Sequence, residues 1–331
     1  MVISSFPKIQ PPGARKQTSV DEHHGIRRTD DYAWLRADNW QQVFHDPSAL
    51  APEIREHLEA ENAYQAAMMA DTEELRSRLL AEMRGRIKED DSSVPLADGP
   101  YAYGSSYRTG GQHPRYFRTP RSGGDQQIIL DGDAEAEGKA FFHLGGVDHS
   151  PDHSRLLWGY DDKGSEFFTL KVRDIASGSD LADLVTDTAG SGVWDFDCGG
   201  FHYTRVDENH RPSRIFHHRL GTDPQEDRLV YEEPDAGFFM NVGGTRDHRW
   251  VMIAINDHET SEYRILDATD PHGEFRVVEP RQKGHQYDLE EGGDCFFVLT
   301  NADGAKDFKI MTAPVDDPRR ANWKELVPHK P

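Results

Sequence analysis

The consecutive residues Asp148-His149-Ser150 are the three residue types of a hydrolytic triad, in which a histidine activates a serine nucleophile and a carboxylate orients the histidine. Side chains of consecutive residues diverge, however, and a triad is assembled by folded geometry rather than by sequence contact. We therefore interpret this tripeptide as a turn between strands. The nucleophile-elbow pattern Gly-x-Ser-x-Gly is absent from the sequence. The sequence predicts no catalytic residue in this chain.

Metal and phosphate chemistry have equally weak support. The pairs His23-His24 and His217-His218 direct their side chains apart on a strand or coil, and neither HExxH nor CxxC occurs. The glycine-rich Ala189-Gly190-Ser191-Gly192 lacks the Gly-Lys-Ser/Thr of a phosphate loop. Acidic loops could bind cations, but they fall where hairpin turns are expected. We predict no metal-binding residue, no cofactor-binding residue and no cofactor.

Short apolar runs of strand length recur along the chain, separated by Gly, Asp, Ser and Pro. The third run of each repeat begins at steps of 51, 47, 47 and 47 residues, at Tyr116, Phe167, Arg214, Ser261 and Phe308. Four strands in a period of about 40–50 residues are typical of a β-propeller. A β-sandwich with accidental spacing is the less favoured alternative.

The predicted fold is mainly β: a propeller of about five four-stranded blades over residues 86–331, preceded by an extended and helical segment over residues 1–85. Polar Asp/Asn turns join the second and third strands of each repeat after the first. We expect no helix longer than about three turns between residues 140 and 300. The expected blades span about residues 93–140, 141–189, 193–233, 238–280 and 285–328.

Residues 1–47 are predicted to be irregular, and residues 48–84 helical. Pro52 lies near the expected start of a first helix, where its missing N–H costs nothing. A second helix is expected to open at Asp71, with Glu74 completing a capping box. Helical spacing predicts that its apolar face consists of Leu75, Leu79, Leu80 and Met83. The charged run 86–91 is interpreted as a linker or hinge.

The chain carries 38 basic and 59 acidic residues, for a net charge of −21. This excess disfavours nucleic acid and anionic membranes as partners, and it fits either a cationic partner or a simple need for solubility. Cys198 and Cys295 are expected to be free thiols on equivalent strands two repeats apart. The sequence contains neither a signal-peptide core nor 18 consecutive apolar residues, so we predict a cytoplasmic protein without a membrane span.

Several sequence motifs, in order along the chain, resemble the oligopeptidase B branch of the prolyl oligopeptidase family of serine peptidases. The two most specific are DDYAWLR and the LVYEE run. The motifs are Asp30–Arg36 (DDYAWLR), Leu58–Tyr64 (LEAENAY), Arg86-Ile87-Lys88 leading to Ser93-Val94-Pro95, Leu220–Asp235 (LGTDPQEDRLVYEEPD) and Thr260-Ser261-Glu262.

The resemblance implies a seven-bladed propeller that covers an α/β-hydrolase domain carrying Ser, Asp and His, with the N-terminal segment packed on the hydrolase. Members of this branch cut short peptides after Lys or Arg. None of their catalytic residues can be assigned here, so we expect a fragment or truncated gene product that is inactive alone, with short basic peptides and the missing hydrolase domain as partners. The alternative is a stand-alone propeller that acts as an interaction scaffold without catalysis.

Overall fold

The computed structural model describes residues 7–330, and the chain divides into two compact bodies. The first body ends at Asp125 and the second begins at Gln126. This division falls within the first predicted repeat. The predicted domain boundary after residue 85, which was drawn from composition, stays a prediction. Each body is described by itself.

The start of the first body is more regular than expected. β1 (Ser19–His23) and β2 (Ile26–Asp30) form an antiparallel hairpin, whose turn has positive φ at His24 (53°) and Gly25 (74°). Short helical segments follow at η1 (Ala33–Leu35), α1 (Trp40–His45) and η2 (Pro47–Ala49). Every residue of the two strands is exposed, so the hairpin lacks the apolar alternation that would have predicted it.

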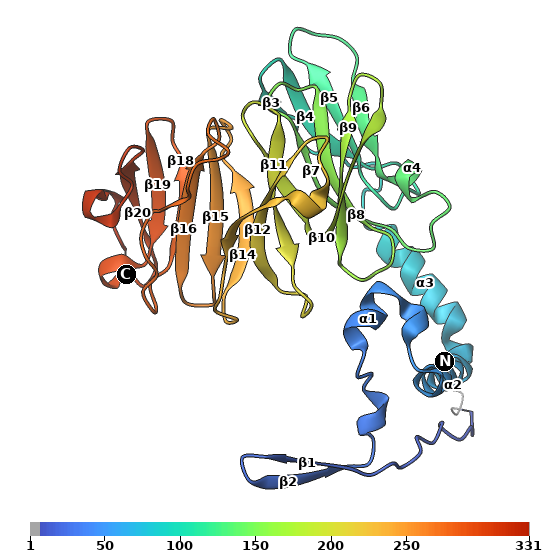
Figure 1. Cartoon of the computed structure of the whole chain (residues 1–331). Helices are drawn as coiled ribbons and strands as arrows, with labels where there is room; N and C mark the ends of the chain where they lie inside the picture. The colour runs from blue at the N-terminus through green and yellow to red at the C-terminus, as the bar shows by residue number, and fades with distance from the viewer. Residues whose placement is uncertain (1–6, 331) are drawn as a thin grey trace. The chain divides into compact units, whose positions relative to one another are not determined.

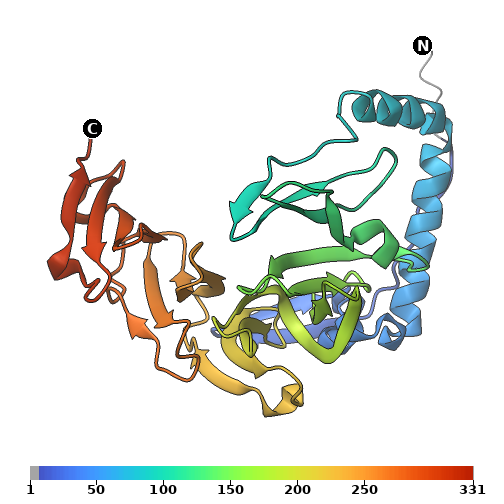
Figure 2. The same cartoon turned by 90° about the horizontal axis from the view of Figure 1, so that it is seen from above.

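Two longer helices follow, α2 (Pro52–Met69) and α3 (Glu73–Arg84), and they run in different directions (Figure 2). Pro52 stands in the first turn of α2, as predicted. The predicted capping box at Asp71 is wrong: the cap is Thr72, whose hydroxyl donates to the Met69 carbonyl at 2.7 Å. The reason is that η3 (Ala70–Thr72) leads directly from one helix into the next. The predicted apolar face of α3 is exposed, at Leu75, Leu79, Leu80 and Met83.

The first body ends with the antiparallel strands β3 (Leu96–Asp98), β4 (Tyr101–Ser106) and β5 (Arg115–Pro120). They include the second and third runs predicted for the first repeat. The fourth predicted run, Ile128–Leu130, lies in β6 (Gln127–Asp131), which is followed by the short helix α4 (Gly132–Ala136) at the start of the second body.

The second and third repeats share one antiparallel sheet of seven strands, where the sequence predicts two separate four-stranded blades. The shared strand is β10 (Ser179–Trp194), with β9 on one side and β11 on the other. The sheet consists of β7 (His143–His149), β8 (Arg155–Asp161), β9 (Phe168–Asp174), β10, β11 (Gly200–Val206), β12 (Pro212–Arg219) and β13 (Arg228–Glu232), with η4 (Pro224–Glu226) before β13.

Glycines explain why β10 continues where a loop was expected. Its register shifts between Thr188 and Gly192, and Gly190 has φ +90°. A Cβ at Gly190 would lie 2.8 Å from the Phe168 ring, and a Cβ at Gly159 of β8 would lie 2.3 Å from the Gly190 carbonyl oxygen. The Gly-rich run Ala189–Gly192 therefore permits close packing of backbone on backbone, as a bulged strand rather than a phosphate loop.

The fourth and fifth repeats are separate four-stranded antiparallel sheets, as predicted (Figure 1). No helix between residues 140 and 300 is longer than the three-residue η4. The fourth consists of β14 (Phe239–Gly244), β15 (Trp250–Asn256), β16 (Ser261–Asp267) and β17 (Arg276–Val277). The fifth consists of β18 (Tyr287–Glu291), β19 (Cys295–Thr300), β20 (Lys309–Pro314) and β21 (Lys324–Val327), with η5 (Ala302–Gly304) and η6 (Arg320–Asn322) in its loops.

The core of the second body lies between successive sheets. One apolar cluster joins Trp250 and Ile265 of the fourth repeat to Phe296 and Val298 of the fifth. A second joins Ile215 of the third repeat to the fourth, and a third lies between the second and third. Each sheet thus buries its faces on its neighbours, which is how propeller blades pack.

On β19, side chains alternate between this core and solvent. Phe296 and Val298 are fully buried, whereas their neighbours Phe297 and Leu299 are 38% and 42% exposed. The predicted placement of both cysteines on equivalent strands is wrong for one of them. Cys295 begins β19, but Cys198 lies in the turn between β10 and β11, with φ +59°. Both are free thiols.

Among the described residues, no helix is both long enough and apolar enough to cross a membrane.

Candidate functional site

The triad-like tripeptide Asp148-His149-Ser150, predicted to be a turn between strands, is a turn only at Ser150, because Asp148 and His149 are the last residues of β7. The Ser150 hydroxyl donates to Asp152 at 2.6 Å and accepts from the Arg155 backbone N–H at 2.9 Å. Ser150 is fully buried. A hydroxyl held by its own turn and closed to solvent has neither the partner nor the access that a nucleophile requires.

The same turn keeps one carboxyl strongly ionised. Asp152 accepts from the hydroxyls of Ser150 and Ser154 and from the Ser154 backbone N–H. Burial opposes ionisation, but these hydrogen bonds outweigh it and lower the pKa of Asp152 to about 2. Nearby, burial raises the pKa of the Cys198 thiol to about 11, so this cysteine is a poor nucleophile at neutral pH.

The pair His217-His218 lies on β12, where the two side chains point to opposite faces of the sheet, as expected from a strand. His218 lies between two carboxylates: its Nδ1 is 2.7 Å from Asp227 and its Nε2 is 3.1 Å from Asp183. Burial disfavours the charged ring, but the two carboxylates outweigh it and raise the pKa of His218.

The network continues to Tyr203, whose hydroxyl donates to Asp227 at 2.8 Å. Burial raises the pKa of this phenol. His218 and Tyr203 are fully buried, so no substrate reaches them. We interpret this network as one that ties β11, β12 and the segment before β13 together.

The other member of the histidine pair faces a different cluster. His217, His202 of β11 and Asp195, which follows β10, come together on one face of the sheet. All three are buried. Neither Asp195 nor His202 belongs to a recognisable sequence motif. The sequence shows only an aspartate and two histidines in three successive segments, and their proximity becomes visible only once the strand register is known.

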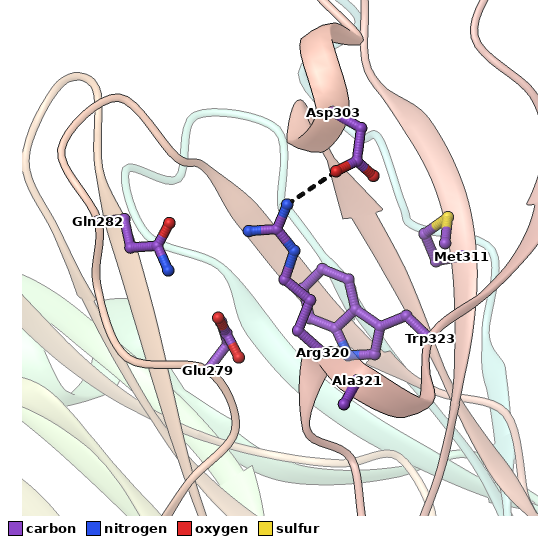
Figure 3. A pocket seen from close by; sticks show the side chains of 7 residues that line it. All are labelled: Glu279, Gln282, Asp303, Met311, Arg320, Ala321 and Trp323. Atoms are coloured by element: carbon purple, nitrogen blue, oxygen red, sulfur yellow. Dashed lines mark hydrogen bonds and ion pairs between the residues drawn. The ribbon is translucent and has the colours of Figure 1, made fainter.

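A surface pocket of about 590 Å³ lies beside η6 and η5 of the fifth repeat (Figure 3). Arg320 crosses it to reach Asp303 at 3.0 Å, and the indole of Trp323 forms one side. A hydrogen bond from Lys309 and the ion pair with Arg320 lower the pKa of Asp303. The pocket is lined by Glu279, Gln282, Asp303, Met311, Arg320, Ala321 and Trp323. This lining holds polar groups that could bind a ligand but no nucleophile paired with a base.

Comparison with known proteins agrees with the fold. The family model described as the prolyl oligopeptidase N-terminal β-propeller domain matches residues 11–331. Dipeptidyl aminopeptidase BI of Pseudoxanthomonas mexicana is 34% identical, over 97% of this chain and 45% of its own length. Protease 2 of Moraxella lacunata is 29% identical, over 92% of this chain and 44% of its own length.

Among solved structures, oligopeptidase B from Leishmania major superimposes with a TM-score of 0.85 at 30% identity, over 97% of this chain and 46% of that one. The chain thus spans less than half the length of these relatives. The match to the family model covers nearly the whole chain, and the successive packed four-strand repeats are the architecture which that model describes. The chain belongs to the prolyl oligopeptidase family and corresponds to its N-terminal β-propeller domain.

Proposed function

We propose that this chain is the N-terminal and propeller portion of an oligopeptidase B-like serine endopeptidase that cleaves short peptides after Lys or Arg. The observation that carries the proposal is the match to oligopeptidase B from Leishmania major over 97% of this chain and only 46% of that protein. The family is one of peptidases, and this chain corresponds to its propeller. The catalytic serine, aspartate and histidine belong to a hydrolase domain outside this chain.

The propeller's part in this activity is to control access. A propeller that covers a hydrolase domain leaves only a narrow opening to the active site, and this opening admits short peptides and excludes folded proteins. The net charge of −21 supports a preference for cationic substrates, because an acidic surface raises the rate at which Lys- and Arg-bearing peptides arrive. Nucleic acid and anionic membranes do not suit such a surface, and the expected compartment is the cytoplasm.

By itself the chain is expected to be inactive. An acyl-enzyme route requires an activated nucleophile and an oxyanion hole. The hydroxyl that the sequence placed next to a histidine and an aspartate, that of Ser150, is buried and bonded within its turn. A fluorophosphonate probe should leave the 331-residue chain unlabelled.

The test uses the protein encoded by the complete reading frame, with the 331-residue chain as its control. Blocked fluorogenic peptides with Arg or Lys before the scissile bond should be cleaved much faster than matched peptides with Glu or Leu. The rate advantage of the Arg and Lys peptides should shrink as salt is added, because salt screens the electrostatic attraction between the acidic protein and cationic peptides. Equal cleavage of all four peptides contradicts the proposed specificity. Cleavage of none of them, or a reading frame without a hydrolase segment, contradicts the proposal and favours the stand-alone scaffold.

One comparison favours a variant of this activity. The relative at 34% identity is named a dipeptidyl aminopeptidase, which suggests removal of N-terminal dipeptides. A free amino terminus then becomes part of the recognised substrate. One tripeptide substrate, tested with a free and with a blocked amino terminus, separates the two activities. Preference for the free form supports the dipeptidyl aminopeptidase, and indifference or preference for the blocked form supports the endopeptidase.

A further inference from the structure

Three adjacent strands bring two imidazoles and one carboxylate together inside the third repeat. His202 of β11 and His217 of β12 are directly opposite each other in the antiparallel register. Asp195 comes just after β10, and its backbone N–H donates to the Gly200 carbonyl at the start of β11. Residues 200 and 202 share a face of β11, so the three side chains lie on the same side of the sheet.

The potential ligand atoms converge. His217 Nε2 is 2.7 Å from Asp195 Oδ2, and His202 Nδ1 is 3.4 Å from Asp195 Oδ1. One ligand atom from each of the three residues lies within 4.8 Å of the other two. The two imidazole rings are 4.7 Å apart between centroids. This is the spacing of donors that surround a single cation with bonds of about 2.0–2.2 Å.

The cluster is closed to bulk water yet incompletely bonded. His202 is 0% exposed, Asp195 2% and His217 6%. Neither ring nitrogen of His202 makes a hydrogen bond, and neither does Asp195 Oδ1, although this oxygen faces His202 Nδ1 at 3.4 Å. A buried imidazole or carboxylate oxygen that makes no hydrogen bond destabilises the folded state. Such groups in a folded protein therefore point to a partner such as a bound ion.

Gly200 lets the neighbouring strand and two of these side chains approach the β11 backbone closely. A Cβ at this position would lie 2.3 Å from the His218 carbonyl oxygen, 2.8 Å from Asp195 Oδ2 and 3.0 Å from His217 Nε2. Its φ is not in the left-handed region, so the glycine is needed for this close packing rather than for its backbone conformation.

We propose that Asp195, His202 and His217 form a structural site for one divalent transition metal, of which Zn²⁺ is the best match. Two imidazoles and one carboxylate are the donor set that suits zinc, whereas Mg²⁺ and Ca²⁺ prefer oxygen ligands.

The role of this site is to hold three strands together. His202 and His217 lie on β11 and β12, and Asp195 directly follows β10, the strand that the second and third repeats share. A bound ion would therefore secure the junction of two blades, with the edge of the Phe275 ring, 5.8 Å from His202, as part of an apolar surround. The site is separate from any peptidase chemistry, so its test does not depend on the proposed function.

The experiment measures zinc in the 331-residue chain after dialysis, first against chelator and then against Zn²⁺, by elemental analysis and calorimetric titration. We expect one ion per chain, a thermal midpoint that rises with Zn²⁺ but not with Mg²⁺ or Ca²⁺, and visible absorption bands of tetrahedral cobalt when Co²⁺ is used instead. Absence of stoichiometric Zn²⁺ binding overturns the proposal.

The variants Asp195→Asn and His202→Gln assign the ligands. Each should weaken Zn²⁺ binding by more than the ~10–100-fold that loss of an outer-shell partner costs. Asp195→Asn has nearly the native shape and keeps a hydrogen-bonding group beside His217, so it separates loss of metal from loss of fold; circular dichroism checks this. The matched control is His258→Ala, an exposed histidine in a turn of the fourth repeat, which should bind Zn²⁺ like the parent. Binding by Asp195→Asn as tight as that of the parent contradicts the assignment.

Discussion

Glu233 and Arg281 are 2.6 Å apart between carboxylate and guanidinium, although 48 residues separate them in the sequence. Glu233 follows β13 of the third repeat, and Arg281 lies in the connection between β17 and β18. The carboxylate also accepts from the Tyr231 hydroxyl and the Asp235 backbone N–H. The guanidinium also approaches Glu262 at 3.4 Å and lies over the Phe238 ring. The pair thus links successive blades through a part of the LVYEE motif.

Replacing Glu233 with Gln should destabilise the chain by about 1–3 kcal/mol, because the carboxylate is buried and Arg281 would lose its shortest partner. The free energy of unfolding in urea measures the effect. The matched control is Asp317→Asn, which removes an exposed pair with Arg319 and should change stability by less than about 1 kcal/mol. Equal losses of unfolding free energy in the two variants would show that the Glu233–Arg281 pair stabilises the chain no more than an exposed ion pair does.

The contribution of Glu233 should depend on pH. Burial raises the pKa of Glu233, but the bonds from Arg281, the Asp235 N–H and Tyr231 outweigh it and lower the pKa below the ordinary value of 4.5. A lowered pKa in the folded state stabilises the fold above the unfolded pKa and loses that effect as the pH falls through the folded pKa. The stability difference between the parent and Glu233→Gln should therefore be constant near neutral pH and shrink below about pH 4.5. A difference that stays constant into the acid range contradicts this assignment.

Gly159→Ala should destabilise the shared sheet by about 2–3 kcal/mol, because the new Cβ would lie 2.3 Å from the Gly190 carbonyl oxygen. The matched control is Gly243→Ala on β14, where no atom lies within 4 Å of the added Cβ and φ is not positive. The control should be neutral or slightly stabilising. Thermal or urea unfolding compares the stabilities of the two variants. Similar stabilities would contradict the prediction, because they would show that β10 moves to accommodate the added methyl group at little cost.

Cys295 should react with a maleimide faster than Cys198 in the native chain. Cys198 is 5% exposed, and burial raises its pKa to about 11, whereas Cys295 is partly exposed at the start of β19. Mass spectrometry of peptides after brief labelling measures the order. In denaturant both thiols should react at once; fewer than two free thiols in the unfolded monomer would contradict the absence of a disulfide.

The isolated chain should self-associate through the fifth repeat and the exposed face of α3. Phe297 and Leu299 lie side by side on the outer face of β19, and apolar patches of this kind promote association. The double variant Phe297→Asn, Leu299→Thr should lower the apparent mass in sedimentation at tens of micromolar. Leu229→Thr, an exposed leucine of the third repeat, serves as the control and should leave it unchanged. A monomeric parent chain at this concentration would contradict the prediction.

The sequence by itself determined the repeats. Apolar runs of strand length between Asp, Asn and Gly turns are local signals, so the strands of the second to fifth repeats and the helices α2 and α3 could be predicted from them. The sequence also excluded a nucleophile elbow, which is a matter of residue order alone. It missed the β1–β2 hairpin, whose exposed residues carry no apolar pattern.

The tertiary structure decided which faces are buried and which polar groups meet. Alternation on β19 places either Phe296 and Val298 or Phe297 and Leu299 in the core, and only packing against the fourth repeat selects the first pair. Sharing of β10 by two repeats depends on a bulge and on the close approach of Gly159 of β8 to Gly190 of β10. Asp195 and His202 belong to no sequence motif, and only the folded strands bring them onto one buried face with His217.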